Sequence, residues 1–152
     1  EKLINSYKEY LYKTAFLYVK NEHDALDIYQ ETVYKAYINI QKLRNTKFFK
    51  TWIIKILINN VNMKNRHYNK FQDEPVEDYI GEIEYSNIEE NIDLYDAIDR
   101  LGEKYKTPVI LQYFHDLTIP QIAEIMECNE NTVKSNIRRA KKKLYDILKE
   151  EK

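Results

Sequence analysis

Glycine is nearly absent from this sequence, and that scarcity excludes several kinds of site at once. The 152 residues include 2 Gly, Gly81 and Gly102, and 3 Pro. Phosphate-binding loops and dinucleotide-binding turns need several glycines in a short stretch, because only glycine lets the backbone turn tightly and approach the ligand. The chain therefore has neither kind of loop. Its apolar residues recur at helical spacing almost throughout, which predicts an all-α protein.

Cysteine and histidine are too few and too scattered for a disulfide framework or a metal site. The chain has 1 Cys, Cys128, and 3 His, at positions 23, 67 and 115. None of these spacings matches a zinc module, so we expect no metal and no cofactor. No apolar run approaches the roughly 18 residues that span a bilayer, and no signal-type segment opens the sequence. We expect a soluble, cytoplasmic protein that does not insert into a membrane.

The charges are balanced in number but separated into long blocks. Residues 42–70 carry eight basic and no acidic side chains, residues 73–103 twelve acidic and one basic, and residues 130–152 eight basic and four acidic. Basic blocks of this length are typical of surfaces that bind polyanions. The pattern predicts two nucleic-acid-binding modules joined by an acidic linker, although charges that only solvate helix faces produce similar blocks.

The N-terminal module, residues 1–70, has the periodicity of three helices. Apolar residues follow helical spacing from Leu3 to Tyr18, and Asn21 is placed to cap a second helix whose apolar stripe includes Ile40 and ends at Leu43. After a polar break at 44–47, a third helix is predicted over residues 48–68. The centre of this helix, residues 52–58, is rich in β-branched side chains and would also suit a buried strand.

Residues 71–92 are predicted to form the acidic linker, and residues 93–152 the C-terminal helical module. The linker lacks a consistent apolar stripe and contains Pro75 and Gly81. In the second module, Thr107 and Pro108 are predicted to begin a helix, as an N-cap followed by proline at the first helical position. The expected apolar face of that helix consists of Val109, Ile110, Tyr113 and Phe114.

A helix-turn-helix is predicted near the C-terminus. Thr118 and Gln121 have the spacing of a capping box, which would open a short helix with the small Ala123 at the helix crossing. The turn at 127–129 has Glu127 where such units often place glycine, and Asn129 is placed to cap the last helix. That helix has one apolar stripe, made of Val133, Ile137, Ala140, Leu144 and Ile147. The layout is that of a DNA-binding helix-turn-helix.

The opposite face of the last helix carries the side chains expected to meet DNA. A helix fits the major groove, so residues near its N-terminus reach base edges. We predict base or near-base contacts from Asn131, Thr132, Ser135 and Arg139, and phosphate contacts from Lys134, Arg138 and Lys142. An amphipathic pair of bundle helices with a solvated basic face is the alternative interpretation.

Three segments together resemble one family. The segment Ile122–Ile125, followed by Thr132–Ser135 and Arg139–Ala140, is similar to the promoter-binding end of bacterial sigma factors of the extracytoplasmic-function (ECF) type. The segment Asp24–Glu31 resembles the polymerase-docking helix of that family, and Phe49–Ile56 with Asn59 and Arg66 resembles its promoter-melting helix. The three segments occur in the order that the family has.

The resemblance implies a dissociable initiation subunit that binds core RNA polymerase and promoter DNA. The N-terminal module would dock on polymerase through Asp24, Asp27, Gln30 and Glu31, which form a mostly acidic patch suited to a basic partner. These acids also suit a helix N-terminus, since Asp24 would lie in the first turn. The C-terminal module would bind the −35 element as duplex.

The same resemblance places recognition and melting of the −10 element around the third helix. The implied contacts are Asn45, Lys47, Phe48, Lys55, Asn59 and Arg66, with Lys50 and Lys64 adding charge. A separated strand needs such a cationic track together with platforms or pockets for unstacked bases. Asn45 and Phe48 are the candidates for holding an extruded base. Trp52 also suits stacking, but its apolar flanks favour a packing role.

Three residues depart from the family pattern. Met63 lies where the family usually has Asp, Leu57 where it usually has Ala, and Asn136 replaces a frequent Arg of the recognition helix. The family also implies an anti-sigma factor as a partner, which is membrane-bound in many relatives.

Other functions remain possible interpretations of the residues alone. A stand-alone helix-turn-helix regulator accounts for the C-terminal module but leaves the N-terminal one without a role. An enzyme would use His67 or His115 with a carboxylate, although no nucleophile–base pair is discernible. A helical adaptor without nucleic acid leaves the segregated cations unexplained. We expect no enzymatic activity.

Overall fold

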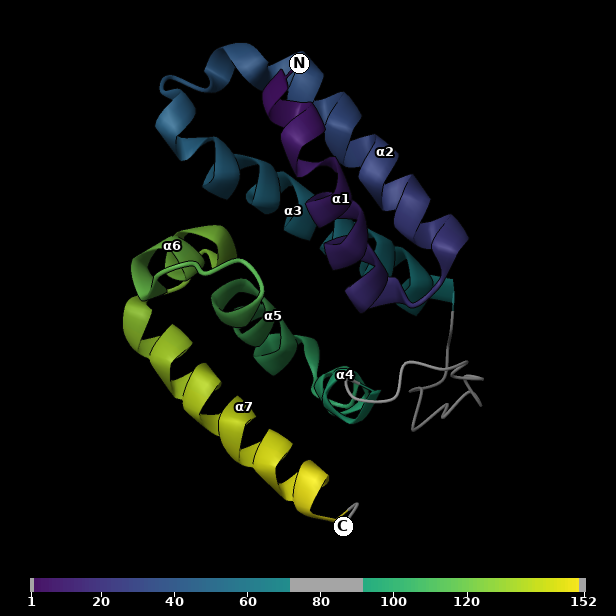
Figure 1. The fold of residues 1–152 in the computed structure, drawn as a ribbon, viewed down its shortest axis with the longest axis vertical. Helices are drawn as coiled ribbons and strands as arrows, with labels where there is room; N and C mark the ends of the chain where they lie inside the picture. The colour runs from purple at the N-terminus through teal and green to yellow at the C-terminus, as the bar shows by residue number, and fades with distance from the viewer. Residues whose placement is uncertain (1, 72–91, 151–152) are drawn as a thin grey trace. The chain divides into compact units, whose positions relative to one another are not determined.

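The chain divides into two compact helical units, Glu1–Gly81 and Glu82–Lys152. The computed structural model describes residues 2–71 and 92–150, and within these ranges all regular structure is helical (Figure 1). The prediction of an all-α protein is confirmed. The predicted linker at 71–92 lies almost entirely outside the described residues, so the predicted domain boundaries stay predictions.

Three helices lie alongside one another in the first unit (Figure 1). They are α1 (Lys2–Val19), α2 (Glu22–Asn39) and α3 (Phe49–Phe71), with the short 3₁₀ helices η1 (Ile40–Lys42) and η2 (Thr46–Phe48) between α2 and α3. The core includes Leu11 and Ala15 of α1, Ala25, Ile28 and Ala36 of α2, and Phe49, Ile53, Leu57 and Val61 of α3. The small alanines let the helix backbones approach closely.

The local signals of the first unit are mostly confirmed. The Asn21 side chain accepts a hydrogen bond from the Asp24 backbone N–H at 3.1 Å and caps α2. Residues 52–58 are helical, so the alternative of a buried strand is wrong, and Ile53, Ile54, Leu57 and Ile58 are buried in the core.

The second predicted helix is shorter than its apolar pattern suggests. The α-helix ends at Asn39, and Ile40 begins η1 with 39% of its surface exposed. The Asn39 side-chain amide donates to the Lys35 carbonyl at 2.9 Å, so it competes with the backbone for a helical acceptor. The stripe predicted through Ile40 therefore breaks one turn early.

The described residues of the second unit, 92–150, form four helices. They are α4 (Ile92–Asp99), α5 (Glu103–Tyr113), α6 (Ile119–Met126) and α7 (Glu130–Glu150). The long α7 contacts all three of the others. Its buried residues Val133, Ile137 and Ala140 meet a core that includes Ala97, Ile110, Leu111 and Ile122.

The predicted start of a helix at Thr107 and Pro108 is wrong. The helix begins at Glu103, after an N-cap at Gly102, and Pro108 lies inside α5. Proline removes one backbone hydrogen bond from a helix interior. Burial of the segment Lys106–Leu111 offsets this loss, and Lys106 joins α5 to α4 through an ion pair of 3.1 Å with Asp99. Tertiary contacts thus override the local proline signal.

The predicted apolar face of α5 is only half correct. Val109 and Ile110 are buried, but Tyr113 is 54% exposed, and Leu111 occupies the core instead. Phe114 lies just beyond the helix and stacks on Tyr95 with ring centroids 5.8 Å apart.

The helix-turn-helix forms as predicted, with caps on both sides of the turn. Thr118 and Gln121 make the reciprocal capping box of α6, and the Asn129 side chain accepts from the Thr132 backbone N–H at 2.8 Å. Between these caps, Glu127 adopts a left-handed conformation (φ 55°, ψ 45°). The Cys128 N–H donates to the Ala123 carbonyl and closes the end of α6.

The turn predicts a stabilising substitution. A residue with a Cβ costs roughly 1–2 kcal/mol in the left-handed region, whereas glycine enters it freely. We expect Glu127→Gly to raise the free energy of unfolding of the second unit by about 0.5–1 kcal/mol. Urea unfolding followed by far-UV circular dichroism measures this change.

The control for Glu127→Gly is Glu124→Gly in the helical part of α6. There glycine has no strain to relieve and should lower stability by about 1 kcal/mol. Equal losses for the two variants would show that the left-handed turn carries no strain that glycine relieves.

Candidate nucleic-acid and polymerase interface

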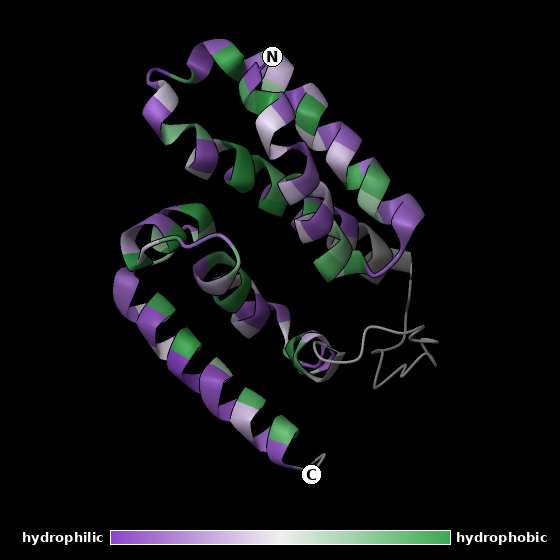
Figure 2. Cartoon of the chain, in the orientation of Figure 1, coloured by the Kyte–Doolittle hydropathy of each residue, from purple (hydrophilic) through white to green (hydrophobic). Residues whose placement is uncertain are grey.

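The α7 helix presents a continuous cationic face. Burial of Val133, Ile137 and Ala140 turns the other side of the helix toward solvent, and polar and apolar residues alternate along its ribbon (Figure 2). Four of the predicted contact residues on that side are exposed lysines or arginines, namely Lys134, Arg138, Arg139 and Lys142. Asn131 is exposed there as well. These side chains are therefore available to a polyanion such as the DNA backbone.

Two of the smaller predicted contact residues are less free than the cations. Ser135 is half-buried, and the Thr132 hydroxyl donates to the Asn129 side chain at 2.9 Å, within the cap of α7. Thr132 can thus meet DNA only while it also supports the turn. Asn136 is 4% exposed and belongs to the interior of the second unit. Its departure from the family pattern therefore changes packing rather than the exposed face.

A shallow groove beside α7 adds a cation that was absent from the predicted site. Ile119 and Ile137 line it, with Lys134, Arg138 and Lys141 around them. Lys141 also lies over the Tyr113 ring, 5.7 Å from its centroid, and Lys143 lies 4.4 Å from the centroid of the Tyr105 ring. Cation–π contacts of this kind hold both lysines toward α5. The sequence does not distinguish these two lysines from the other cations, because the charges are evenly spaced along α7.

The predicted polymerase-docking residues lie together on α2, but their acids are not isolated. The Lys64 ammonium of α3 lies 3.1 Å from Asp24 Oδ1 and 3.6 Å from Asp27 Oδ2. His23 Nε2 lies 3.6 Å from Asp27 Oδ2. The lysine expected to extend the DNA track thus faces carboxylates instead, and the patch is acidic only in part.

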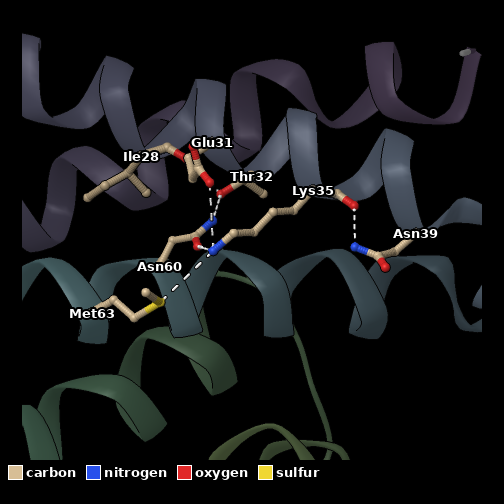
Figure 3. Close-up of polar contacts among 7 residues, drawn as sticks. All are labelled: Ile28, Glu31, Thr32, Lys35, Asn39, Asn60 and Met63. Atoms are coloured by element: carbon tan, nitrogen blue, oxygen red, sulfur yellow. Dashed lines mark hydrogen bonds and ion pairs between the residues drawn. The ribbon is translucent and has the colours of Figure 1, made fainter.

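The remaining acid of the patch belongs to a hydrogen-bonded network between α2 and α3. Glu31 lies 3.8 Å from Lys35, and the Lys35 ammonium donates to Asn60 Oδ1 at 2.6 Å (Figure 3). Asn60 donates in turn to the buried Thr32 hydroxyl at 3.0 Å, and Thr32 donates to the Ile28 carbonyl at 2.7 Å. Met63 Sδ lies 3.9 Å from the same ammonium. Sequence reasoning missed this network, because nothing local relates residues 25 or 28 positions apart.

The residues predicted for the −10 element surround η2 and follow α3. Asn45 accepts from the Lys47 N–H at 3.0 Å and so caps η2, which occupies part of its hydrogen-bonding capacity. Phe48 is 59% exposed, although it is apolar. Lys47 and Asn59 are exposed and Lys55 is half-buried, while the Arg66 side chain lies outside the described residues.

The Trp52 ring packs against a neighbouring aromatic ring. Its ring centroid lies 5.8 Å from that of the buried Phe49, and Phe49 also contacts the Tyr7 ring. The packing role predicted for Trp52 is thereby favoured over an open stacking platform.

The described residues contain no group of His, Cys, Asp and Glu side chains that would hold a metal ion. Among the helices in these ranges, none is both long and apolar enough to cross a bilayer. His115 is fully buried in the second unit, which separates it from any substrate in solvent.

Comparison with known families decides the identity of the chain. The model of Sigma-70 region 2 matches residues 3–70, and that of Sigma-70, region 4 matches residues 91–144. The chain belongs to the sigma-70 family. The two matches coincide with the two helical units, and the second includes the helix-turn-helix.

Individual relatives show to which group of sigma factors the chain belongs. The chain is 38% identical to the RNA polymerase sigma factor SigV of Bacillus subtilis (strain 168), over 91% of this chain and 84% of the relative. It is 28% identical to the ECF RNA polymerase sigma factor SigW of the same organism, over 97% of this chain and 88% of the relative. The chain is a sigma factor of the ECF type, as the motifs predicted.

Solved structures agree on the fold. The sigma factor RpoE of Bartonella quintana, in its complex with the anti-sigma factor NepR, matches with a TM-score of 0.80 and 22% identity, over 97% of this chain and 95% of that one. CnrH, in complex with the cytosolic domain of CnrY, matches with a TM-score of 0.73 and 16% identity, over 99% of this chain and 88% of that one.

The buried amide at the α2–α3 contact provides a test of the network. Removing the Asn60 side chain takes away the hydrogen bond that the buried Thr32 hydroxyl accepts and the amide acceptor of Lys35. Loss of a partner by a buried polar group costs about 1–3 kcal/mol. We expect Asn60→Ala to lower the free energy of unfolding of the first unit by that amount. Fluorescence of Trp52, the one tryptophan of the chain, reports the transition.

The matched control is Asn59→Ala at the preceding position of α3, where the side chain is exposed. Surface substitutions of this kind change stability by about 0.5 kcal/mol or less. If both variants unfold at the same urea concentration, the network contributes nothing to stability.

Proposed function

We propose that this sigma factor directs core RNA polymerase to promoters with a −10 and a −35 element, and that each unit reads one of them. The observation that carries the proposal is the exposed cationic face of α7, which follows a capped helix-turn-helix in a chain of this family. Addition of the chain to core polymerase should yield transcripts from defined genomic promoters. Footprinting of the complex would locate both elements.

The C-terminal unit would bind the −35 element as duplex. A recognition helix enters the major groove with its N-terminal residues at the base edges. In this arrangement Asn131, Thr132, Ser135 and Arg139 meet bases, while Lys134, Arg138 and Lys142 meet phosphates. Lys141, at the groove beside α6, extends the phosphate contacts along one side of α7.

The N-terminal unit would dock on polymerase and hold the separated −10 strand. Docking uses Asp24, Asp27, Gln30 and Glu31 on α2. The strand follows Asn45, Lys47, Phe48, Lys55, Asn59 and Arg66, and the exposed Phe48 ring offers a surface on which an unstacked base can rest. We place the boundary of this unit near residue 70, with the acidic linker at 71–92 and the second unit from 93 onward.

An anti-sigma factor is the third partner that we infer, because the similar structure of RpoE is a complex with the anti-sigma factor NepR. The similar structure of CnrH is likewise a complex, with the cytosolic domain of CnrY. A subunit that works with RNA polymerase acts in the cytoplasm and needs no catalytic activity of its own. A stand-alone regulator is disfavoured by the match of region 2 to residues 3–70, which gives the N-terminal unit a role. Co-migration with core polymerase in gel filtration distinguishes the two functions.

Two substitutions on α7 separate base contacts from phosphate contacts. A good bidentate contact to a base contributes about 1–3 kcal/mol of discrimination. Arg139→Ala should therefore weaken binding to the −35 element by that amount and leave the affinity for unrelated DNA unchanged. Lys142→Ala should weaken binding to all sequences alike and reduce the salt slope by about one phosphate. Fluorescence anisotropy with specific and scrambled duplexes measures both. Identical behaviour of the two variants would contradict this division of roles.

Phe48 provides the matching test in the N-terminal unit. Stacking of a base on an aromatic ring contributes about 1–3 kcal/mol, so Phe48→Ala should weaken holoenzyme binding to a promoter with an unpaired −10 strand by roughly that amount. Binding to fully paired −35 duplex should stay unchanged. Phe16→Ala, on the partly exposed face of α1, is the matched control. If the Phe48→Ala holoenzyme bound the unpaired −10 strand with wild-type affinity, the Phe48 ring would not belong to the binding site.

A further inference from the structure

The Lys64 side chain connects the two functional helices of the first unit. It extends from α3, where the −10 contacts are proposed, to Asp24 and Asp27 on α2, where polymerase docking is proposed. The side chains of Lys64 and Asp24 are 23% and 21% exposed, so this contact is partly shielded from water. Charges in such a position are screened less than charges at the open surface.

The pairing leaves the docking patch close to neutral. Three carboxylates, those of Asp24, Asp27 and Glu31, are accompanied by the ammonium groups of Lys64 and Lys35. A basic partner approaching this face meets about one uncompensated negative charge instead of three. To bind the acids, the partner must therefore displace the lysines that already lie against them and put its own basic groups in their place.

The two lysines differ in how they are held. Lys35 donates a hydrogen bond of 2.6 Å to Asn60, and its contact with Glu31 is the longer one, at 3.8 Å. Lys64 is held by the two carboxylates themselves, at 3.1 and 3.6 Å. Taking the carboxylates away would release Lys64, whereas Lys35 would keep its amide partner.

We propose that Lys64 is an internal counter-ion of the docking surface, which basic groups of core polymerase displace when they bind Asp24 and Asp27. This inference rests on the proposed docking function of α2. Lys64 thus restrains docking in the free protein.

The test compares the affinity of Lys64→Gln and wild-type chains for core polymerase. With a fluorophore at the N-terminus and titration of core enzyme at low salt, we expect Lys64→Gln to bind about three- to five-fold more tightly, because the freed carboxylates attract the basic partner. The advantage should shrink at high salt. Lys64→Arg keeps the charge and should bind like the wild type.

Two controls assign the effect to the contact. Lys8→Gln, at an exposed lysine of α1 rather than of α2 or α3, makes the same change in net charge and should leave the affinity unchanged. In a chain that already carries Asp24→Asn and Asp27→Asn, Lys64→Gln should have no further effect on affinity. A three- to five-fold gain that persists in that background would overturn the proposal.

Binding of the folded Lys64→Gln chain at or below wild-type affinity would also overturn it, and would make Lys64 a residue that organises the acids for docking. Circular dichroism establishes that the variant is folded, and Lys64→Met, which keeps the aliphatic stem, repeats the comparison if glutamine disturbs α3. Failure of the wild-type chain to bind core polymerase would instead reject the docking function itself.

Discussion

The contact between α2 and α3 is the interaction on which the N-terminal unit depends. Small residues such as Ala25 and Ala36 let α2 pack closely, and the buried pair Thr32 and Asn60 joins the two helices by a hydrogen bond. A buried polar pair of this kind tolerates little displacement, because each group loses its partner if the helices slide. The contact therefore fixes the acids of α2 relative to the cations of α3.

In the C-terminal unit, packing and capping of α7 determine how its cations are presented at the surface. The α7 helix has one buried stripe, so its charged side chains are forced outward once that stripe meets α5 and α6. The caps at Thr118 and Asn129 fix where α6 begins and where α7 begins, and the left-handed Glu127 sets the angle between them. The direction in which the cations of α7 point therefore follows from the packing of its apolar side and from the caps at the turn.

Structural features that depend on neighbouring residues could be predicted from the sequence, whereas features that depend on the rest of the fold could not. The capping box at Thr118 and the cap at Asn21 were predicted because each involves residues three positions apart. The predicted cap at Thr107 failed although its local pattern was equally clear. Burial of Pro108 between neighbouring helices outweighs the lost hydrogen bond, and no local rule contains that energy.

Helical periodicity, end caps and the separation of charge into blocks were determined by the sequence itself, because each depends on neighbours within a few positions. They sufficed for an all-α fold, a helix-turn-helix and a family. Tertiary structure alone decided that Lys64 lies against Asp24 and Asp27, that Asn136 is buried, and that Tyr113 is not. Such outcomes require two helices to meet in one particular alignment, and that alignment is set by the shape and burial of whole faces.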